Sequence, residues 1–242
     1  IAGWLRVRYP DNEAMQVSHE TIYRALYVQA RGTLKRELTR HLRRGRSRRY
    51  ARSQSSKGQG QGKLCGMVMI SERPPEVEDR AVPGHWEGDL LMGGRTSAIA
   101  TLVERQTRYC QLVALPAGSG AVEVCEALKQ SITTLPAQLR RSLTWDQGSE
   151  MREHRRFSVE SGVEVYFCDP RSPWQRGSNE NTNGLLRQYF PKRTSLAGIG
   201  QERLDEVAEK LNRRPRKTLG FATPADKLAE LIDGLEQPGT ER

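Results

Sequence analysis

Three acidic residues, Asp89, Asp146 and Glu180, lie far apart in the chain and in segments of different predicted structure. Asp89 lies within a predicted strand, Asp146 ends another strand, and Glu180 begins a helix. The carboxyl ends of neighbouring strands are where α/β sheets place their sites, so the three side chains can meet if the strands of Asp89 and Asp146 are adjacent. Carboxylates bind Mg²⁺, and two such ions about 3.5–4 Å apart activate a hydroxyl and stabilise the leaving oxygen of a phosphodiester. The acids therefore predict metal-dependent phosphodiester chemistry.

The helix that carries Glu180 is predicted to begin near Gly177 and to end before Pro191. Ser178 or Asn179 is the predicted N-cap. A carboxylate in the first turn of a helix is also a common stabilising device, so Glu180 alone does not indicate catalysis. At about 100° per residue the helix has two faces. One face is formed by Glu180, Asn183, Gly184 and Arg187, and the packing face is formed by Thr182, Leu185, Leu186 and Tyr189.

The order of strands and helices predicts an α/β fold with a mixed five-stranded sheet and helices on both faces. The predicted strands are 85–92, 98–103, 109–115, 143–146 and 163–168. Predicted helices at 120–132, near 150–161, at 202–213 and at 224–233 accompany them. The first of these has a predicted buried stripe of Val122, Cys125, Leu128 and Ile132, and 202–213 has one of Leu204, Val207, Ala208 and Leu211.

A net charge of +10 predicts an anionic partner. Residues 31–57 contain eleven Lys or Arg residues and one acid, Glu37. Such a run is often only a solvated surface, but this density favours contacts with phosphates. The segment is predicted to form a helix over 34–43 and then a linker rich in Ser, Gln and Gly over 53–62.

The scattered cysteines, with no Cys-x-x-Cys pair, predict reduced thiols and a cytoplasmic protein. No apolar run approaches the ~18 residues of a membrane span, so we expect no membrane partner. The chain opens without Met, at Ile1 in what reads as the inside of a helix, and a fragment lacking N-terminal residues is expected.

Residues 1–30 predict two short amphipathic helices, the second with Ser18 as its N-cap. This pattern fits part of a helix-turn-helix, in which the second helix enters the DNA major groove. An ordinary helical hairpin explains the same pattern equally well.

Three long motifs together resemble the IS30 family of bacterial insertion-sequence transposases, which belongs with the Asp-Asp-Glu transposases and retroviral integrases. They are Gly84–Leu90, Thr144–Glu150 and Cys168–Gly184. The 33 residues between Asp146 and Glu180, and Arg187 seven residues after Glu180, match the family's spacing. Further similar segments are Val17–Tyr23, Leu211–Leu219 and Thr223–Pro224.

The resemblance implies a ribonuclease-H-like, integrase-type catalytic core at 77–238, preceded by a partial helix-turn-helix-like DNA-binding segment at 1–30 and a basic helix and linker at 31–76. Asp89, Asp146 and Glu180 would be the catalytic ligands of two Mg²⁺ (or Mn²⁺) ions. Water and then a DNA 3′-hydroxyl would be the nucleophiles, with no covalent protein–DNA intermediate. The partners would be double-stranded DNA, both terminal repeats and target, and further copies of the chain in a synaptic complex near the bacterial nucleoid.

Several residues are predicted to contact DNA. Arg187 would hold a phosphate near the cut, Trp174 would stack on an unpaired base or else simply pack, and Arg171 or Arg176 would hold phosphate. The backbone contacts of the basic run are assigned to Arg43, Arg44, Arg46, Arg48 and Arg49. A second basic patch is formed by Arg213, Arg214, Arg216 and Lys217.

Alternatives remain at the site and for the whole protein. Glu87 shares a strand face with Asp89 and is an alternative metal ligand, whereas Glu150 is interpreted as a helix-start acid. A zinc site that includes His85 or His154 is rejected because the spacing provides no paired ligands. The functional alternatives are a catalytically inactive DNA-binding protein, such as a repressor, and a metal nuclease that cleaves without joining.

Overall fold

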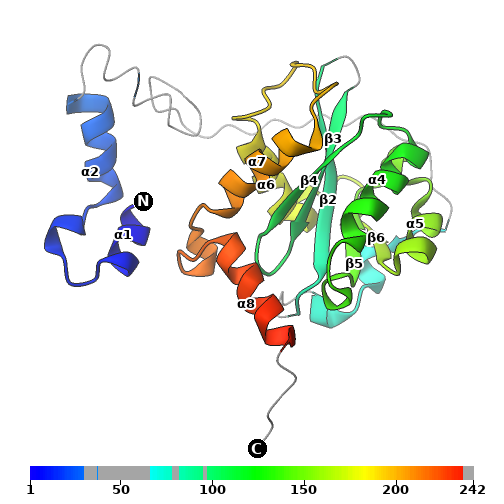
Figure 1. Ribbon diagram of the computed structural model, residues 1–242, viewed down its shortest axis with the longest axis horizontal. Helices are drawn as coiled ribbons and strands as arrows, with labels where there is room; N and C mark the ends of the chain where they lie inside the picture. Colours follow the sequence, from blue (N-terminus) through cyan, green and yellow to red (C-terminus); the bar gives the residue numbers. More distant parts are fainter. Residues whose placement is uncertain (30–36, 38–65, 78–81, 95–96, 237–242) are drawn as a thin grey trace, which may run out of the picture. The chain divides into compact units, whose positions relative to one another are not determined.

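The structure is a computed structural model that describes residues 1–29, 37, 66–77, 82–94 and 97–236 (Figure 1). The chain divides into two compact units, each described by itself below. One comprises Ile1–Lys57 with Pro215–Ala222, and the other comprises Gly58–Arg214 with Thr223–Arg242.

The larger unit is built on a six-stranded mixed sheet with the order β1-β6-β5-β2-β3-β4. Strands β2, β3 and β4 form an antiparallel meander, whereas β5 is parallel to both β2 and β6, and β1 is parallel to β6. The strands are β1 (Val68–Met69), β2 (His85–Met92), β3 (Ala98–Glu104), β4 (Cys110–Ala114), β5 (Ser142–Trp145) and β6 (Glu164–Phe167).

Helices cover both faces of this sheet, as predicted (Figure 1). One face packs against α4 (Ala121–Thr133) and α5 (His154–Ser161), and the other packs against α6 (Gly177–Leu186) and α7 (Gln201–Asn212). The last helix, α8 (Pro224–Glu236), follows α7. Because successive strand residues point to opposite faces, β2, β3 and β4 each contribute to two separate cores.

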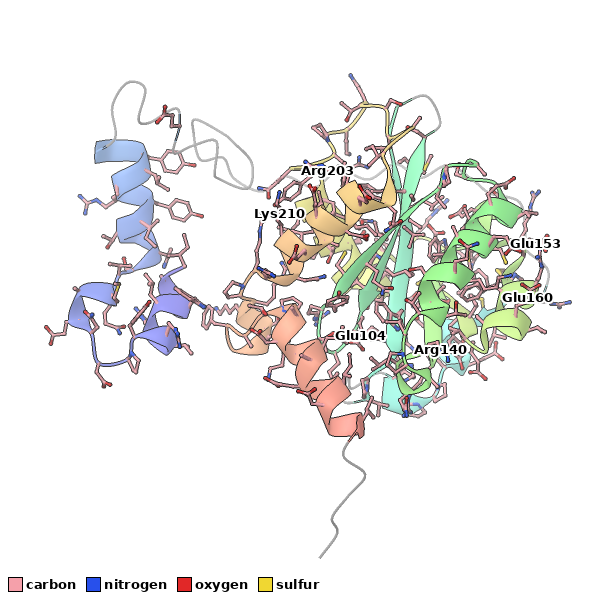
Figure 2. The ribbon with its side chains drawn as sticks, in the orientation of Figure 1. Glu104, Arg140, Glu153, Glu160, Arg203 and Lys210 are labelled. Atoms are coloured by element: carbon pink, nitrogen blue, oxygen red, sulfur yellow. The ribbon has the colours of Figure 1, made fainter. Side chains whose placement is uncertain are left out.

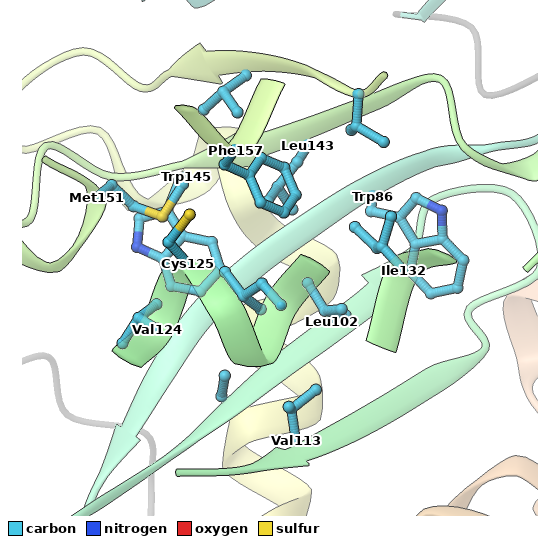
Figure 3. Close-up of a cluster of buried hydrophobic side chains, with 14 of the residues drawn as sticks. Trp86, Leu102, Val113, Val124, Cys125, Ile132, Leu143, Trp145, Met151 and Phe157 are labelled. Carbon is cyan, nitrogen blue, oxygen red and sulfur yellow. The ribbon is translucent and has the colours of Figure 1, made fainter. Parts of the chain in front are cut away.

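The core under α4 and α5 combines large aromatic side chains with aliphatic ones (Figure 3). Trp86, Trp145 and Phe157 are fully buried in it. Gly88 lies on the same face of β2, and a Cβ on this glycine would come 2.1 Å from a ring atom of Trp145. The residue before Asp89 therefore has to be small for the Trp145 ring to pack across β2. At the surface, Glu160 of α5 (labelled in Figure 2) pairs with Lys129 of α4 at 2.6 Å.

The core under α6 and α7 is aliphatic. Leu185 and Leu186 of α6 pack with Leu204, Val207 and Leu211 of α7 against the sheet. The alternation of β2 places Leu91 in this core, and so Glu87 and Asp89 face α6 as well. The acidic residues of β2 thus lie on the face opposite the tryptophans.

All five predicted strands and the helices of the larger unit are present, and β1 is an additional strand too short to be recognised from the sequence. The buried stripe predicted for 202–213 is confirmed, but that of α4 was wrong at one position. Val122 is 49% exposed and Val124 is buried in its place. Val122 lies about 200° around the helix from Val124, and the buried stripe is centred on Val124, Cys125, Leu128 and Ile132.

The region after Asp146 is less regular than predicted. A 3₁₀ turn at Ser149–Met151 precedes α5, which begins only at His154. Helix α6 likewise ends at Leu186, before the predicted Phe190, although tighter backbone turns continue as far as Phe190.

The smaller unit contains α1 (Ala2–Arg8), a 3₁₀ turn at Glu13–Met15 and α2 (His19–Arg24). Ser18 caps α2 as predicted, since its side chain accepts a hydrogen bond from Thr21 N at 3.0 Å. Neither helix has a buried residue. The helix-turn-helix interpretation stays a prediction.

The predicted helix at 34–43 (apart from Glu37), the linker at 53–62 and the basic-run residues Arg43, Arg44, Arg46, Arg48 and Arg49 lie outside the described residues. Within the described part of the chain, none of the helices has the length and apolar character needed to cross a membrane.

His85 opens β2 as a buried imidazole, with Nδ1 2.7 Å from Ser142 Oγ. Burial, together with the nearby Arg141, Arg105 and Arg73, lowers the pKa of His85 from 6.5 to about 4. The folded protein thus keeps this ring neutral under conditions in which an unfolded chain would protonate it.

We expect acid to destabilise the fold through this residue. Between about pH 7.5 and pH 5, His85 takes up a proton in the unfolded chain but stays neutral in the folded protein. The free energy of unfolding therefore falls by about 2 kcal/mol. Urea unfolding of the wild type and of His85→Gln at the two pH values measures the contribution of His85 to this fall. His19→Gln, an exposed control, should keep the full pH dependence; the same dependence in His85→Gln would contradict the assignment.

Candidate active site

Asp89 and Asp146 are brought together by the parallel pairing of β2 with β5. Glu87 is in register with Thr144, so two residues further along the pair Asp89 lies level with Asp146. The strands of Asp89 and Asp146 are therefore adjacent, which the sequence permitted but did not show. Both side chains remain accessible, since 27% of Asp89 and 40% of Asp146 is exposed.

The guanidinium of Arg176 bridges the two aspartates. Its Nη1 lies 3.3 Å from Asp89 Oδ1, and its Nη2 donates to Asp146 Oδ2 at 3.1 Å. Nη1 also donates to the carbonyl of Gly88 at 2.6 Å. Only 8% of Arg176 is exposed. Sequence reasoning assigned this residue to phosphate binding and missed its contact with the carboxylates.

Burial raises the pKa of Asp89 above its usual value. The Arg176 guanidinium opposes this shift, and the neighbouring Asp146 carboxylate adds to it. The pKa of Arg176 is raised in turn, because the two carboxylates outweigh the effect of its burial. The two carboxylates thus lie close together in a partly buried position, with the Arg176 guanidinium between them.

Glu180 lies in the first turn of α6, and its side chain is exposed. Asn183, one turn later on the same face, donates from Nδ2 to Asp89 Oδ2 at 3.0 Å. This contact turns the face that carries Glu180 toward the aspartates. Among the described residues, however, no three Asp, Glu, His or Cys side chains come close enough to hold a metal ion together. The structure joins two of the three acids and leaves the third outside this cluster.

A carboxylate from the sheet caps α6. Glu87 is fully buried, and its Oε2 accepts hydrogen bonds from the backbone N–H of Ser178 at 2.8 Å and of Asn179 at 3.0 Å. Its Oε1 lies 3.4 Å from Nε of the buried Arg105. The predicted capping by Ser178 or Asn179 was wrong, because α6 already includes both residues: it begins at Gly177, with Arg176 at the N-cap position, and has no side-chain cap of its own. The first-turn N–H groups of a helix need acceptors, and here Glu87 provides them.

Asn179 adds a second tie between α6 and the sheet. Its amide donates to the carbonyl of Glu87 at 2.9 Å and to that of Thr101 at 3.1 Å. The Thr101 hydroxyl in turn donates to the carbonyl of Asp89 at 3.1 Å. The helix that carries Glu180 and the strand that carries Asp89 are therefore held by one buried network.

The loop between β6 and α6 displays two of the residues predicted to contact DNA, Arg171 and Trp174. The side chains of Asp169 and Gln175 close this loop with a 2.8 Å hydrogen bond. Trp174 is 72% exposed, so it is not the packed residue of the alternative interpretation, and Arg171 is exposed too. Arg187 lies at the end of α6, where it donates to the carbonyl of Met92 at 2.9 Å. Their contacts with DNA stay predictions.

The remaining polar residues near the site have structural partners. Glu150 lies in the first turn of a 3₁₀ helix, as predicted, and accepts a hydrogen bond from the Trp145 indole at 3.0 Å. His154 hydrogen-bonds to the carbonyl of Met151. Burial raises the pKa of Cys168 to about 11, which keeps this thiol protonated and a poor metal ligand.

Comparison with known proteins agrees with this geometry. The Integrase core domain family matches residues 79–173. The chain is 49% identical over 233 residues to the transposase for insertion sequence element IS1086 of Cupriavidus metallidurans, a match that covers 96% of this chain and 68% of that protein. The chain belongs to the IS30 family of insertion-sequence transposases.

Other relatives support the same assignment. The Escherichia coli transposase InsI for insertion sequence element IS30A is 50% identical over 93% of this chain. The transposase for IS4351 of Bacteroides fragilis is 37% identical over 90% of the chain. The chain spans 59% of the length of InsI, and the larger unit described here has the ribonuclease-H-like architecture of an integrase core.

Two further contacts of this IS30-family chain were missed by sequence reasoning. Glu87 was considered as a metal ligand, yet the structure shows it capping α6. The sequence carried no signal for this contact, since Ser178 and Asn179 offered caps within the helix itself. The contact of Asn183 with Asp89 was also missed, although Asn183 had been placed on the same helix face as Glu180.

We expect Glu87→Gln to lower the free energy of unfolding by about 3 kcal/mol, because it removes a buried charge that faces both Arg105 and the N-terminus of α6. Urea unfolding measures the loss. Hydrogen exchange should show faster exchange of the Ser178 and Asn179 amides in particular.

Glu202→Gln is the matched control, because Glu202 is an exposed first-turn acid of α7. It should cost less than about 1 kcal/mol. A Glu87→Gln variant as stable as this control, with unchanged exchange at Ser178, would show that Glu87 does not hold the helix.

Proposed function

We propose that this chain contains the catalytic core of a DNA transposase, which cuts the ends of an insertion sequence and joins them to target DNA. The observation that carries the proposal is the pair Asp89 and Asp146, side by side on adjacent parallel strands with a cation between them. Glu180 lies on a helix whose same face contacts Asp89. Family membership supports the same activity, since the relatives are named as transposases.

The residues fit divalent metal ions. Mg²⁺ prefers carboxylate oxygens, and the place between Asp89 and Asp146 already accommodates positive charge. Asp89, Asp146 and Glu180 would hold the ions, with Glu180 completing the set by a change of side-chain conformation. Two Mg²⁺ or Mn²⁺ ions would activate the attacking hydroxyl and stabilise the leaving oxygen of the phosphodiester.

The protein's own part is to bind and orient the DNA. Arg187, at the end of α6, would hold a phosphate near the cut, and the exposed Trp174 would stack on an unpaired base. Arg171 would contribute a further phosphate contact from the same loop. Water and then the freed DNA 3′-hydroxyl would be the nucleophiles. The element's terminal repeats and the target would be bound as double-stranded DNA by more than one copy of the protein.

We expect Glu180→Gln to reduce strand transfer by at least about 100-fold while DNA binding stays within about twofold, since losing a metal ligand removes several kcal/mol of transition-state stabilisation. The assay follows labelled 3′ ends of the repeat DNA that flanks the coding sequence into joined products. Binding of the same DNA is measured in parallel by fluorescence anisotropy. Glu202→Gln, on the surface of α7, is the control for loss of an acidic residue.

Three outcomes would overturn the proposal. Unchanged joining by Glu180→Gln would remove Glu180 from the site. Cleaved ends that never become joined, in the wild type, would indicate a nuclease instead. A wild type that binds the repeats without cutting them would indicate a DNA-binding protein that has lost catalysis.

A further inference from the structure

Arg176 occupies the place between the aspartates that a metal ion would need. Its two terminal nitrogens each face a different carboxylate, at 3.3 Å from Asp89 and 3.1 Å from Asp146. Arg176 is the last residue of the 3₁₀ turn Pro173–Arg176, which directly precedes α6. It is almost completely buried, so the contact is not an exposed surface pair that solvent would screen.

Every oxygen of the two carboxylates already has a donor. Asp89 Oδ1 accepts from Leu90 N at 2.9 Å and faces Arg176, and its Oδ2 accepts from Asn183. Asp146 Oδ1 accepts from Gly148 N at 3.0 Å, and its Oδ2 accepts from Arg176. The backbone and amide donors are neutral and can share an oxygen with a metal ion. The guanidinium is charged and repels one at this distance.

We propose that Arg176 is a positioning residue that acts as an internal counter-cation. In the metal-free protein it holds Asp89 and Asp146 together, and it gives up at least one of these carboxylates when divalent ions bind. The inference rests on the proposed function, because it takes the metal site to lie between these aspartates. It adds a competition between a side chain and the metal ions for the same oxygens.

The exposed position of Glu180 agrees with this competition. With Arg176 in place the pair of aspartates is already neutralised in part, and the third acid has no cation to approach. Once the guanidinium leaves a carboxylate, its charge lies beside the reacting centre, where a DNA phosphate is a suitable new partner. The phosphate contact expected of Arg176 and its contact with the aspartates then belong to two successive states.

A purely structural tie would behave differently. Arg176 also donates to the carbonyl of Gly88 and so anchors the loop before α6 to β2. If anchoring were its only role, removal of the guanidinium would loosen the aspartates and weaken metal binding. Competition predicts the opposite sign, which makes metal affinity the decisive quantity.

The experiment measures Mn²⁺ affinity of the full chain without DNA, by electron paramagnetic resonance of free Mn²⁺. Arg176→Met should bind Mn²⁺ at least about tenfold more tightly than wild type, because a nearby positive charge is removed. Arg176→Lys, which keeps the charge, should lie much closer to wild type. In EDTA the Met variant should melt at a lower temperature than wild type, and Mn²⁺ should raise its melting temperature by more.

Arg152→Met, an exposed arginine six residues after Asp146, is the control and should leave Mn²⁺ affinity unchanged. Asp89→Asn separates this inference from the proposed function. If Asp89→Asn binds Mn²⁺ as wild type does, the metal site itself is misplaced. If Asp89→Asn loses Mn²⁺ but Arg176→Met gains no affinity, the metal site stands and the counter-cation role is overturned. Absence of Mn²⁺ binding in both wild type and Arg176→Met would also overturn it.

If the Arg176→Met variant fails to fold, a measurement on the wild-type protein tests the same proposal. In protein labelled with ¹⁵N-arginine, the Arg176 Nε–H signal, assigned by its loss in Arg176→Lys, should move when Mg²⁺ is added. A signal that stays unchanged at saturating Mg²⁺ would contradict the displacement.

Discussion

The repulsion between two neighbouring carboxylates is the constraint on which this structure depends. Parallel pairing of β2 with β5 places Asp89 level with Asp146, and burial makes the pair costly to ionise. The guanidinium of Arg176 and neutral hydrogen-bond donors from Asn183 and the backbone offset this cost locally. The protein's own positive charge thus holds the two carboxylates together.

The two faces of the sheet carry different kinds of residue. One face of β2 and β5 carries Trp86 and Trp145, which bury the strands against α4 and α5 and require a glycine at position 88. The opposite face carries Glu87 and Asp89, which face α6. Because adjacent strand residues alternate between faces, a single strand anchors the core and presents an acid without conflict. Glu87 extends this arrangement by fixing the helix of the third acid to the same strand.

Much of the fold was predictable from the sequence because it follows from local periodicity. The five longer strands, the helices on both faces and the Ser18 cap were all correctly predicted. The approach of Asp89 to Asp146 was only permitted, since strand order depends on contacts between distant segments. Capping of α6 by Glu87 and bridging by Arg176 join residues about 90 and 30 positions apart, and no local pattern encodes such pairs. The motifs predicted the candidate residues Asp89, Asp146 and Glu180, whereas the contacts that balance the charges of the two aspartates required the structure.

The most direct test of the central claim is the position of Mn²⁺ in a crystal of the chain, located by anomalous scattering after soaking. We expect a peak between Asp89 and Asp146, with the Arg176 guanidinium moved away from at least one carboxylate and Glu180 turned toward the ion. A peak at another place, or an undisturbed Arg176 bridge with no peak at saturating Mn²⁺, would contradict it.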